Sequence, residues 1–296
     1  MKVNAMQISS DIVHTAPHDA ATVIILRNGP QGLEVFLVQR HSCSEVLGGA
    51  YVFPGGKRDD SDSQLEAALH LDVTAQQLHA QLAEPDLPIA QAKALYVAAL
   101  REAFEECGVL FAQDLQATAI QTIAAQLQQG RMFNLAVAGH GLRLHTQSLL
   151  PWSRWITPRM PSFTSKRFDT RFFVAALPHG QTARHDGVET THSIWLTPHA
   201  ALQRYWAREM ELAPPQIMTL AHLARHHTVA SALQSARQGP PPLVLPEPFD
   251  DQGERVLTYP GDPWHSVQQR AMPGPTRLHY RNQRFEPAQG FAALFA

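Results

Sequence analysis

The sequence predicts an α/β fold in which a sheet of short strands carries helices on both faces. Two apolar, β-branched runs at 21–27 and 34–39 flank an Asn-Gly-Pro-Gln-Gly segment at 28–32, which predicts an antiparallel hairpin. A helical pattern from about Ile89 to Cys107 has an apolar face that can pack on a sheet. A later helical pattern, roughly 215–237, supplies a layer for the other face. Together these patterns favour an α/β/α sandwich.

The remaining elements are short. Residues 63–93 are expected to be helical in two pieces, with Thr74 as the N-cap of a helix that carries Leu78 and Leu82. Apolar and β-branched runs predict further strands, which lie at 50–53, 143–145, 156–157, 171–176, 193–196, 243–245, 255–259 and 276–280.

Composition limits the classes of function. The 296 residues include 44% hydrophobic residues, enough for a core, and the formal charge of −2 predicts no bulk attraction to nucleic acid or to anionic membranes. We expect neither as a partner. No membrane span or signal peptide is recognisable, and with only two cysteines, Cys43 and Cys107, a disulfide framework is excluded and a cytoplasmic location expected. The 16 histidines show no zinc-site spacing.

The most informative segment is the nonapeptide Arg-Glu-Ala-Phe-Glu-Glu-Cys-Gly-Val at 101–109. Residues at i, i+3 and i+4 share one helix face, so Glu102, Glu105 and Glu106 form a carboxylate cluster. Like charges at this spacing repel, which suggests a compensating cation, and an all-oxygen ligand set indicates a hard ion such as Mg²⁺ or Mn²⁺. Gly108 is expected to end the helix in the left-handed conformation. The alternative interpretation is a solvated acidic face.

A second segment lies upstream, Val-Phe-Pro-Gly-Gly-Lys at 52–57. The two segments together resemble the Nudix box, in which Gly is followed after five residues by Glu, and after seven more by Arg-Glu-(apolar)-x-Glu-Glu-x-Gly. Here Gly56 is the glycine, Asp62 stands where the family has Glu, and Arg101 comes about 31 residues later than in the family pattern. An insertion at about 63–93 therefore interrupts the box.

The resemblance implies a Nudix α/β/α sandwich with a mixed sheet. We expect the Nudix domain to occupy 18–211 and a C-terminal extension to occupy 212–296. Whether the extension packs on the core or on a second subunit, as in a homodimer, stays open. The insertion, 63–93, is expected to wall one side of the substrate pocket or to contact a second subunit, because long loops are usually functional.

Further segments narrow the resemblance to the long-box acyl-CoA diphosphatase branch of the superfamily. They lie at 49–56, 151–158, 166–173 and 212–216. The branch implies hydrolysis of CoA or acyl-CoA to 3′,5′-ADP and (acyl-)phosphopantetheine. A motif of another CoA-cleaving Nudix group is matched by Arg40 and Gly49 but not by His41 and Glu45. The alternatives are a diphosphatase for ADP-ribose, NADH or nucleotide sugars, and a non-catalytic Nudix sensor, which the intact carboxylate set disfavours.

The family pattern assigns roles to the acidic residues. Glu102, Glu105 and Glu106 would ligate Mg²⁺ or Mn²⁺; Glu105, and after it Glu102, are the catalytic candidates, with Glu105 preferred as the proton acceptor. Arg101 is expected to pair with a carboxylate near Asp62, which is a structural role.

One acid outside the box is also a candidate. Glu189 lies six residues before Trp195, in a stretch similar to acid-to-Trp stretches of the superfamily, and is a possible extra ligand. The alternative is a surface residue at a strand end.

Basic and aromatic side chains supply candidates for substrate contacts, since guanidinium and ammonium groups bind phosphates and indoles can stack on adenine. For each of them the alternative is a solvated base or a buried core ring. The bases are Arg40, Lys57, Arg58, Lys166 and Arg167, and the indoles are Trp152 and Trp155.

Overall fold

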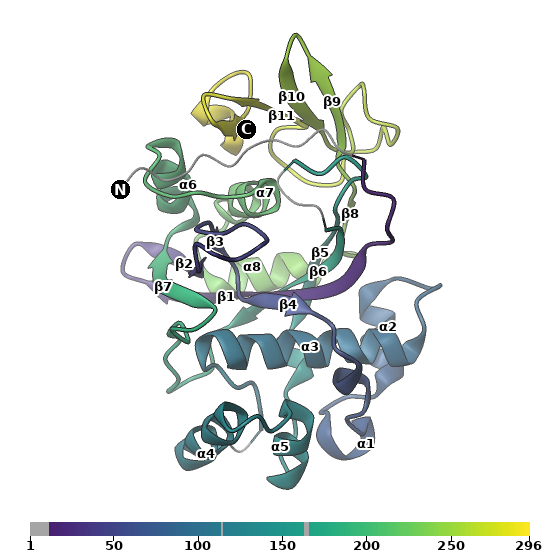
Figure 1. The fold of residues 1–296 in the computed structure, drawn as a ribbon, viewed down its shortest axis with the longest axis vertical. Helices are drawn as coiled ribbons and strands as arrows, with labels where there is room; N and C mark the ends of the chain where they lie inside the picture. Colours follow the sequence, from purple (N-terminus) through teal and green to yellow (C-terminus); the bar gives the residue numbers. More distant parts are fainter. Residues whose placement is uncertain (1–11, 114, 163–165) are drawn as a thin grey trace.

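The predicted hairpin forms the middle of a mixed sheet. In the computed structural model, which describes residues 12–113, 115–162 and 166–296, β1 (His18–Gly29) and β2 (Gly32–Arg40) pair antiparallel within an eight-stranded sheet. β1 also pairs in parallel with β6 (Phe168–Ala176), so the sheet is mixed, as the resemblance implies (Figure 1).

The sheet has the order β3-β2-β1-β6-β5-β8, while β4 pairs with β1 and β7 pairs with β2. The bounds of the other five strands are β3 Tyr51–Val52, β4 Gly55–Lys57, β5 Leu150–Ile156, β7 Thr190–Leu196 and β8 Leu243–Val244. The strand β4 pairs antiparallel with the first half of β1, which places Gly55 and Gly56 directly beside Thr22 and Ala21.

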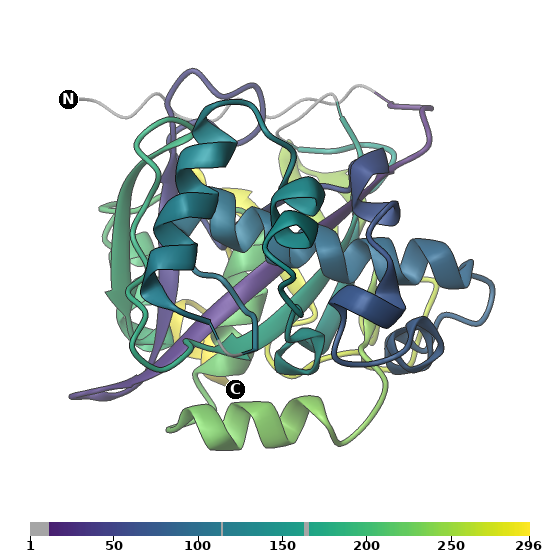
Figure 2. The same ribbon diagram turned by 90° about the horizontal axis from the view of Figure 1, so that it is seen from below.

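Alternation along β1 divides the core into two halves. Ala21, Val23 and Ile25 face one side and contribute to the core beneath α3 (Ile89–Cys107), whereas Ile24 and Leu26 belong to the core on the other side. On the same side, α4 (Ala117–Gln128) and α5 (Phe133–Gly139) lie beyond α3, and Figure 2, seen from below, shows them in front of it. This alternation is the period of two that a sheet buried on both faces requires.

The insertion packs along the outer end of α3. It follows η1 (Asp60–Ser63) and contains α1 (Ala67–His70) and α2 (Ala75–Leu82), and the Thr74 hydroxyl accepts from the Gln77 N–H as the expected N-cap. Leu78 and Leu82 are buried in the core shared with α3. The insertion is thus part of the first helical layer.

Glu84, at the end of the insertion, ties that layer to the sheet. Its carboxylate accepts from Arg171 on β6 at 3.0 Å and lies 2.8 Å from the Arg154 guanidinium on β5. Asp169 accepts from Arg154 as well, at 2.8 Å. Because Arg171 is only 3% exposed, this network is an internal one.

The second face of the sheet is covered by the C-terminal third of the chain. Helices α6 (Pro198–Trp206), α7 (Pro214–Leu223) and α8 (Val229–Ala236) pack there, and β8 joins the main sheet beside β5. A small antiparallel sheet then closes this side, followed by η3 (Phe291–Phe295). Its strands are β9 (Glu247–Asp251), β10 (Glu254–Thr258), β11 (Arg277–Arg281) and β12 (Arg284–Glu286).

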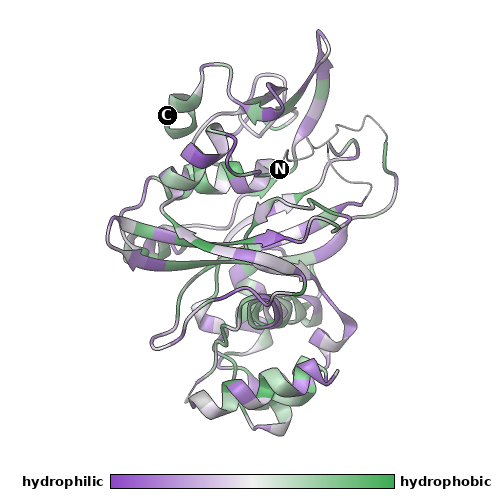
Figure 3. Cartoon of the chain, turned by 60° about the vertical axis from the view of Figure 1, so that its left-hand side comes forward, coloured by the Kyte–Doolittle hydropathy of each residue, from purple (hydrophilic) through white to green (hydrophobic). Residues whose placement is uncertain are grey.

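Residues after 211 therefore pack on the core of the same chain, and the α/β/α arrangement is confirmed. In Figure 3, hydrophobic and hydrophilic residues alternate along the helices that cover the sheet, as amphipathic helices require. No helix among the described residues is long and apolar enough to cross a membrane. Cys43 and Cys107 are both free.

Two predicted elements were wrong. Residues 143–145 form no strand, because Leu144 makes only isolated bridges with Leu71 and Ala112. The helix predicted over 215–237 is two helices, since Thr228 begins a new one by accepting from the Ser231 N–H. Helices α4, α5 and α6 were not among the predicted elements.

Candidate active site

The carboxylate cluster lies on the last two turns of α3. The helix ends where predicted, with Gly108 at φ 69° in the left-handed region. The N–H groups of Gly108 and Val109 return to the carbonyls of Phe104 and Ala103, which closes the helix end. Glu102 and Glu106 point toward β4, while Glu105 is more exposed.

Arg101 holds the two acidic segments together. Its guanidinium donates to both carboxylate oxygens of Asp62, at 2.9 and 3.0 Å, and to the Lys57 carbonyl at 2.9 Å. It also donates to Glu102 at 2.7 Å and to Glu105 at 3.0 Å. The contact expected between Arg101 and Asp62 is present, so the shorter aspartate still reaches the arginine.

Two glycines let β4 approach the cluster. The Gly55 N–H donates to Glu106 Oε2 at 2.9 Å. At Gly56, a Cβ atom would lie 2.4 Å from Glu102 Oε1, a distance that no side chain could tolerate without displacing the carboxylate. The Gly-Gly pair therefore permits close packing of backbone against the acids.

Burial raises the pKa values of the three carboxylates on α3. Burial raises the pKa of Glu102 to about 7, although Arg101 opposes the shift. Burial, followed by repulsion from Glu102, raises the pKa of Glu106 to about 8. The pKa of Glu105 is raised as well, chiefly by burial. Buried acids in this state bind a proton or a cation, and the cluster fits a divalent ion by its chemistry.

The side chains are not already arranged as a closed metal cage. Within the described part of the chain, no three His, Cys, Asp or Glu side chains converge to form such a site. Arg101 donates to one oxygen of Glu102 and to one oxygen of Glu105, which leaves the other oxygen of each carboxylate available. Glu189, from the loop before β7, lies close enough to raise the pKa values of Glu102 and Glu106 by repulsion. The structure thus brings a fourth acid to the cluster.

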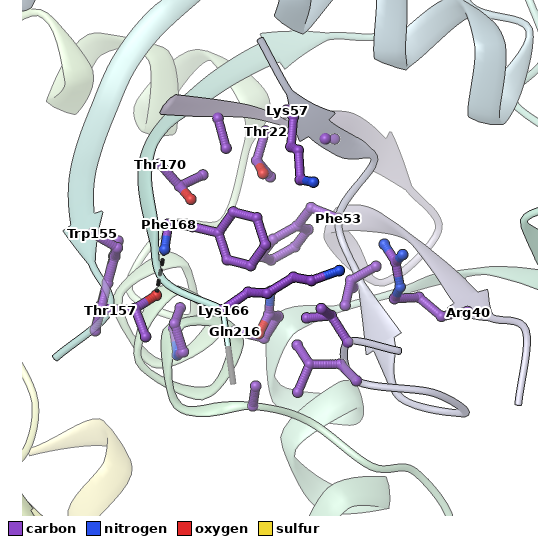
Figure 4. Close-up of a pocket in the computed structure, with 18 of the residues that line it drawn as sticks. Thr22, Arg40, Phe53, Lys57, Trp155, Thr157, Lys166, Phe168, Thr170 and Gln216 are labelled. Atoms are coloured by element: carbon purple, nitrogen blue, oxygen red, sulfur yellow. Dashed lines mark hydrogen bonds between the residues drawn. The ribbon is translucent and has the colours of Figure 1, made fainter. Parts of the chain in front are cut away.

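A cavity of about 860 Å³ opens beside the cluster. Its polar end is lined by Gly56, Glu102, Glu105 and Glu189, and apolar side chains line much of its remaining wall. The latter come from three parts of the chain and include Val46, Leu47, Phe53, Trp155, Phe168, Phe172, Pro214, Pro215, Pro246 and Leu257. Figure 4 shows Phe53 and Phe168 in the middle of this space, with Lys57 to one side and Gln216 to the other.

Three of the five predicted bases line the cavity. Arg40 and Lys57 do so directly, and Lys166 does so while paired with Glu45. Arg58 and Arg167 lie outside the cavity wall.

Arg167 and Arg58 are kept away from the cavity by other contacts. The Arg167 guanidinium is buried and donates to the carbonyls of Thr157 and Thr15, so it fastens the chain ahead of β6. Arg58 lies near Asp60 and Asp19, at 3.4 and 3.9 Å.

Of the two tryptophans proposed to stack on adenine, only Trp155 lines the cavity. Trp155 lines the cavity with a ring that is 4% exposed, whereas Trp152 packs against His222 with ring centroids 4.4 Å apart.

The expectation that the insertion walls one side of the pocket was wrong. Residues 63–93, all of which the structure describes, line no part of the cavity. Their apolar face is used against α3 instead, so only the second option, a subunit contact, stays a prediction.

Sequence reasoning missed several wall residues. Phe53, Phe168 and Gln216 lie within segments that resemble the acyl-CoA diphosphatase branch, so the resemblance carried a signal for them. The same holds for Thr170 on β6, whereas Thr22, on the paired strand β1, lies in none of these segments.

The α/β/α fold, in which the carboxylates of α3 face the two glycines of β4, indicates the family to which the protein belongs. The chain belongs to the Nudix family: residues 11–223 match the family model described as the NUDT19 Nudix domain. The chain is 28% identical to a NUDIX hydrolase from Alicyclobacillus acidocaldarius of known crystal structure, with a TM-score of 0.62. That comparison covers 77% of this chain and all of the other.

Curated relatives point to one branch of the family. The chain is 25% identical over 233 residues to the acyl-coenzyme A diphosphatase NUDT19 of Xenopus laevis, covering 67% of this chain and 61% of the relative. It is 26% identical over 230 residues to the human protein of that name, covering 66% and 61%. The chain thus spans about three fifths of the length of these relatives.

Proposed function

We propose that this protein is a divalent-metal-dependent diphosphatase whose substrate is CoA or acyl-CoA, cleaved to 3′,5′-ADP and (acyl-)phosphopantetheine. The observation that carries the proposal is the continuity of one cavity. Glu102 and Glu105, whose pKa values are raised, line one end, with Glu106 behind them on the same helix, and a largely apolar wall extends from that end. CoA has the matching polarity, with a diphosphate attached to a long uncharged arm.

The charged end accounts for the chemistry. Nudix hydrolases generally use divalent metals, and we propose that Glu102, Glu105 and Glu106 hold Mg²⁺ or Mn²⁺ here. When bound, such an ion supplies positive charge that neutralises the diphosphate oxygens. Glu189 is proposed as an additional acid at this end.

The protein's own groups orient the reaction. Glu105 is proposed to accept the proton of the attacking water, because its side chain is 37% exposed while that of Glu102 is 12% exposed. Lys57 and Arg40, on the cavity wall, would attract the phosphates. Arg101 also lines the cavity and positions Glu102 and Glu105 by donating to both carboxylates.

The printed names of the NUDT19 relatives support the acyl-CoA assignment. A substrate panel tests it: CoA, an acyl-CoA, dephospho-CoA, ADP-ribose and NADH, each with Mg²⁺ and with product identification. CoA or acyl-CoA should give the highest kcat/KM. Dephospho-CoA lacks only the 3′-phosphate. The decrease in its kcat/KM relative to CoA therefore measures the contact to that phosphate, and a charge-assisted contact contributes about 1.5–3 kcal/mol. Faster cleavage of ADP-ribose or NADH would leave only the general diphosphatase assignment.

Two further features are proposals. A cytoplasmic location agrees with the two free cysteines. A homodimer formed through the insertion or the C-terminal extension would be tested by light scattering.

A further inference from the structure

Three buried polar atoms without a hydrogen-bond partner belong to residues on the cavity wall. Within the described part of the chain they are Arg40 Nε, Ser162 Oγ and Gln216 Oε1. A buried polar group without a partner is costly, and native structures keep few of them. Among the described residues, three of the eight such atoms gather around this one cavity, where a bound ligand can supply the missing partners.

Gln216 is the most informative of the three. Its side chain is 7% exposed and lies in the first turn of α7, at the end of the cavity away from Lys57 in Figure 4. The two preceding residues, Pro214 and Pro215, have no N–H groups. A helix start usually attracts anions through such N–H groups, and these prolines remove them. The side-chain amide is therefore left as a neutral polar group in an apolar wall.

The neighbouring rings argue for a chain rather than a flat base at this position. Phe53, Phe172 and Trp155 are 2%, 3% and 4% exposed, so these rings leave little free surface in the cavity for a base to stack on. Stacking a base would require an open ring face. A glutamine amide both donates and accepts, which matches the N–H and C=O of a secondary amide in a flexible arm.

We propose that Gln216 is the residue that recognises an amide group of the substrate's uncharged arm and so selects substrates that carry one. This inference rests on the proposed function, since the pantetheine arm of CoA contains two such amides. In either orientation of the Gln216 amide, the arm can offer the complementary group. The C-terminal extension, which begins before this residue, thereby takes part in substrate choice.

The test uses the two halves of the CoA molecule as competitive inhibitors. 4′-Phosphopantetheine contains the arm, and 3′,5′-ADP contains the nucleotide. In Gln216→Leu and Gln216→Met, the inhibition constant of 4′-phosphopantetheine should rise about tenfold, as for loss of one hydrogen-bonded pair. The inhibition constant of 3′,5′-ADP should stay unchanged. The KM for CoA should rise together with the inhibition constant of 4′-phosphopantetheine.

A matched control lies one turn further along the same helix. Thr219 is 2% exposed, its hydroxyl has no hydrogen-bond partner, and it does not line the cavity. Thr219→Val should therefore leave both inhibition constants unchanged. Neither kind of variant should lower Tm, because each removes an unpaired buried polar group.

Two results would overturn the inference alone. The first is CoA cleavage with unaltered inhibition by 4′-phosphopantetheine in both Gln216 variants. The second is an equal loss for 3′,5′-ADP, which would assign Gln216 to the nucleotide. If the wild-type protein does not cleave CoA while it cleaves another diphosphate, the CoA assignment falls together with this inference.

Discussion

Removal of the Arg101 guanidinium should destabilise the protein strongly. Arg101 is 6% exposed and donates to Asp62, which is 1% exposed, through two bonds of 2.9 and 3.0 Å. Arg101→Met would leave Asp62 as a buried charge without its partner and would also release Glu102 and Glu105. Breaking a buried ion pair from one side costs about 3–5 kcal/mol. We expect a loss of that size in the free energy of unfolding.

A matched pair on the C-terminal sheet serves as the control. Arg281 donates to Glu286 at 3.0 Å, but its side chain is 33% exposed and Arg284 also donates to Glu286. Arg281→Met should therefore cost less than about 1 kcal/mol.

Urea unfolding at neutral pH, monitored by fluorescence, measures both losses. The double variant Arg101→Met/Asp62→Asn should lose less than the sum of the two single changes, because the second removes the charge that the first exposes. A loss below about 1 kcal/mol for Arg101→Met, or strict additivity, would refute the claim that this network fixes the loop against α3.

Three further predictions concern the carboxylates and a buried histidine. Glu105→Gln and Glu106→Gln should each lower kcat by about 10²–10³, or roughly 2–4 kcal/mol of transition-state stabilisation, with the fold retained by circular dichroism; near-wild-type turnover would exclude the proposed role. Gly56→Ala should lower kcat because its Cβ would lie 2.4 Å from Glu102 Oε1, and steady-state kinetics of a folded variant with normal turnover would contradict this. Burial lowers the pKa of His222 from 6.5 to about 4, so the unfolded chain binds a proton in this window and the native protein should lose stability as the pH falls from 6.5 toward 4. At about 1.4 kcal/mol for each pH unit, the loss is at most about 3.5 kcal/mol, and urea titrations should show it below pH 6, relative to pH 8, in the wild type but not in His222→Gln.

Local signals explain what the sequence predicted well. The helix Ile89–Cys107 has the bounds expected, because Pro88 and Gly108 set its ends through short-range geometry. The pairing of Arg101 with Asp62 also followed from the family pattern, despite the long insertion between them. Such features depend on a few neighbouring residues or on a strict motif.

Long-range packing explains what the sequence could not predict. Phe53 and Gln216 line the same cavity although they are far apart in the chain, and no local pattern records that they lie there together. Arg167 and Lys166 are adjacent, yet only Lys166 reaches the cavity, because the Arg167 side chain is occupied by two backbone carbonyls. The insertion was expected at the pocket on grounds of length alone, and its apolar face proved to be matched to α3.

The central claim is that the carboxylate cluster on α3 supports metal-dependent hydrolysis of a diphosphate. The most direct measurement is turnover of CoA by the purified, dialysed protein with chelator, and then with Mg²⁺ or Mn²⁺ restored, with the products identified by mass spectrometry. We predict that 3′,5′-ADP and 4′-phosphopantetheine form with either ion, that chelation abolishes their formation, and that Zn²⁺ is not required. Turnover that persists after chelation and dialysis would contradict the claim.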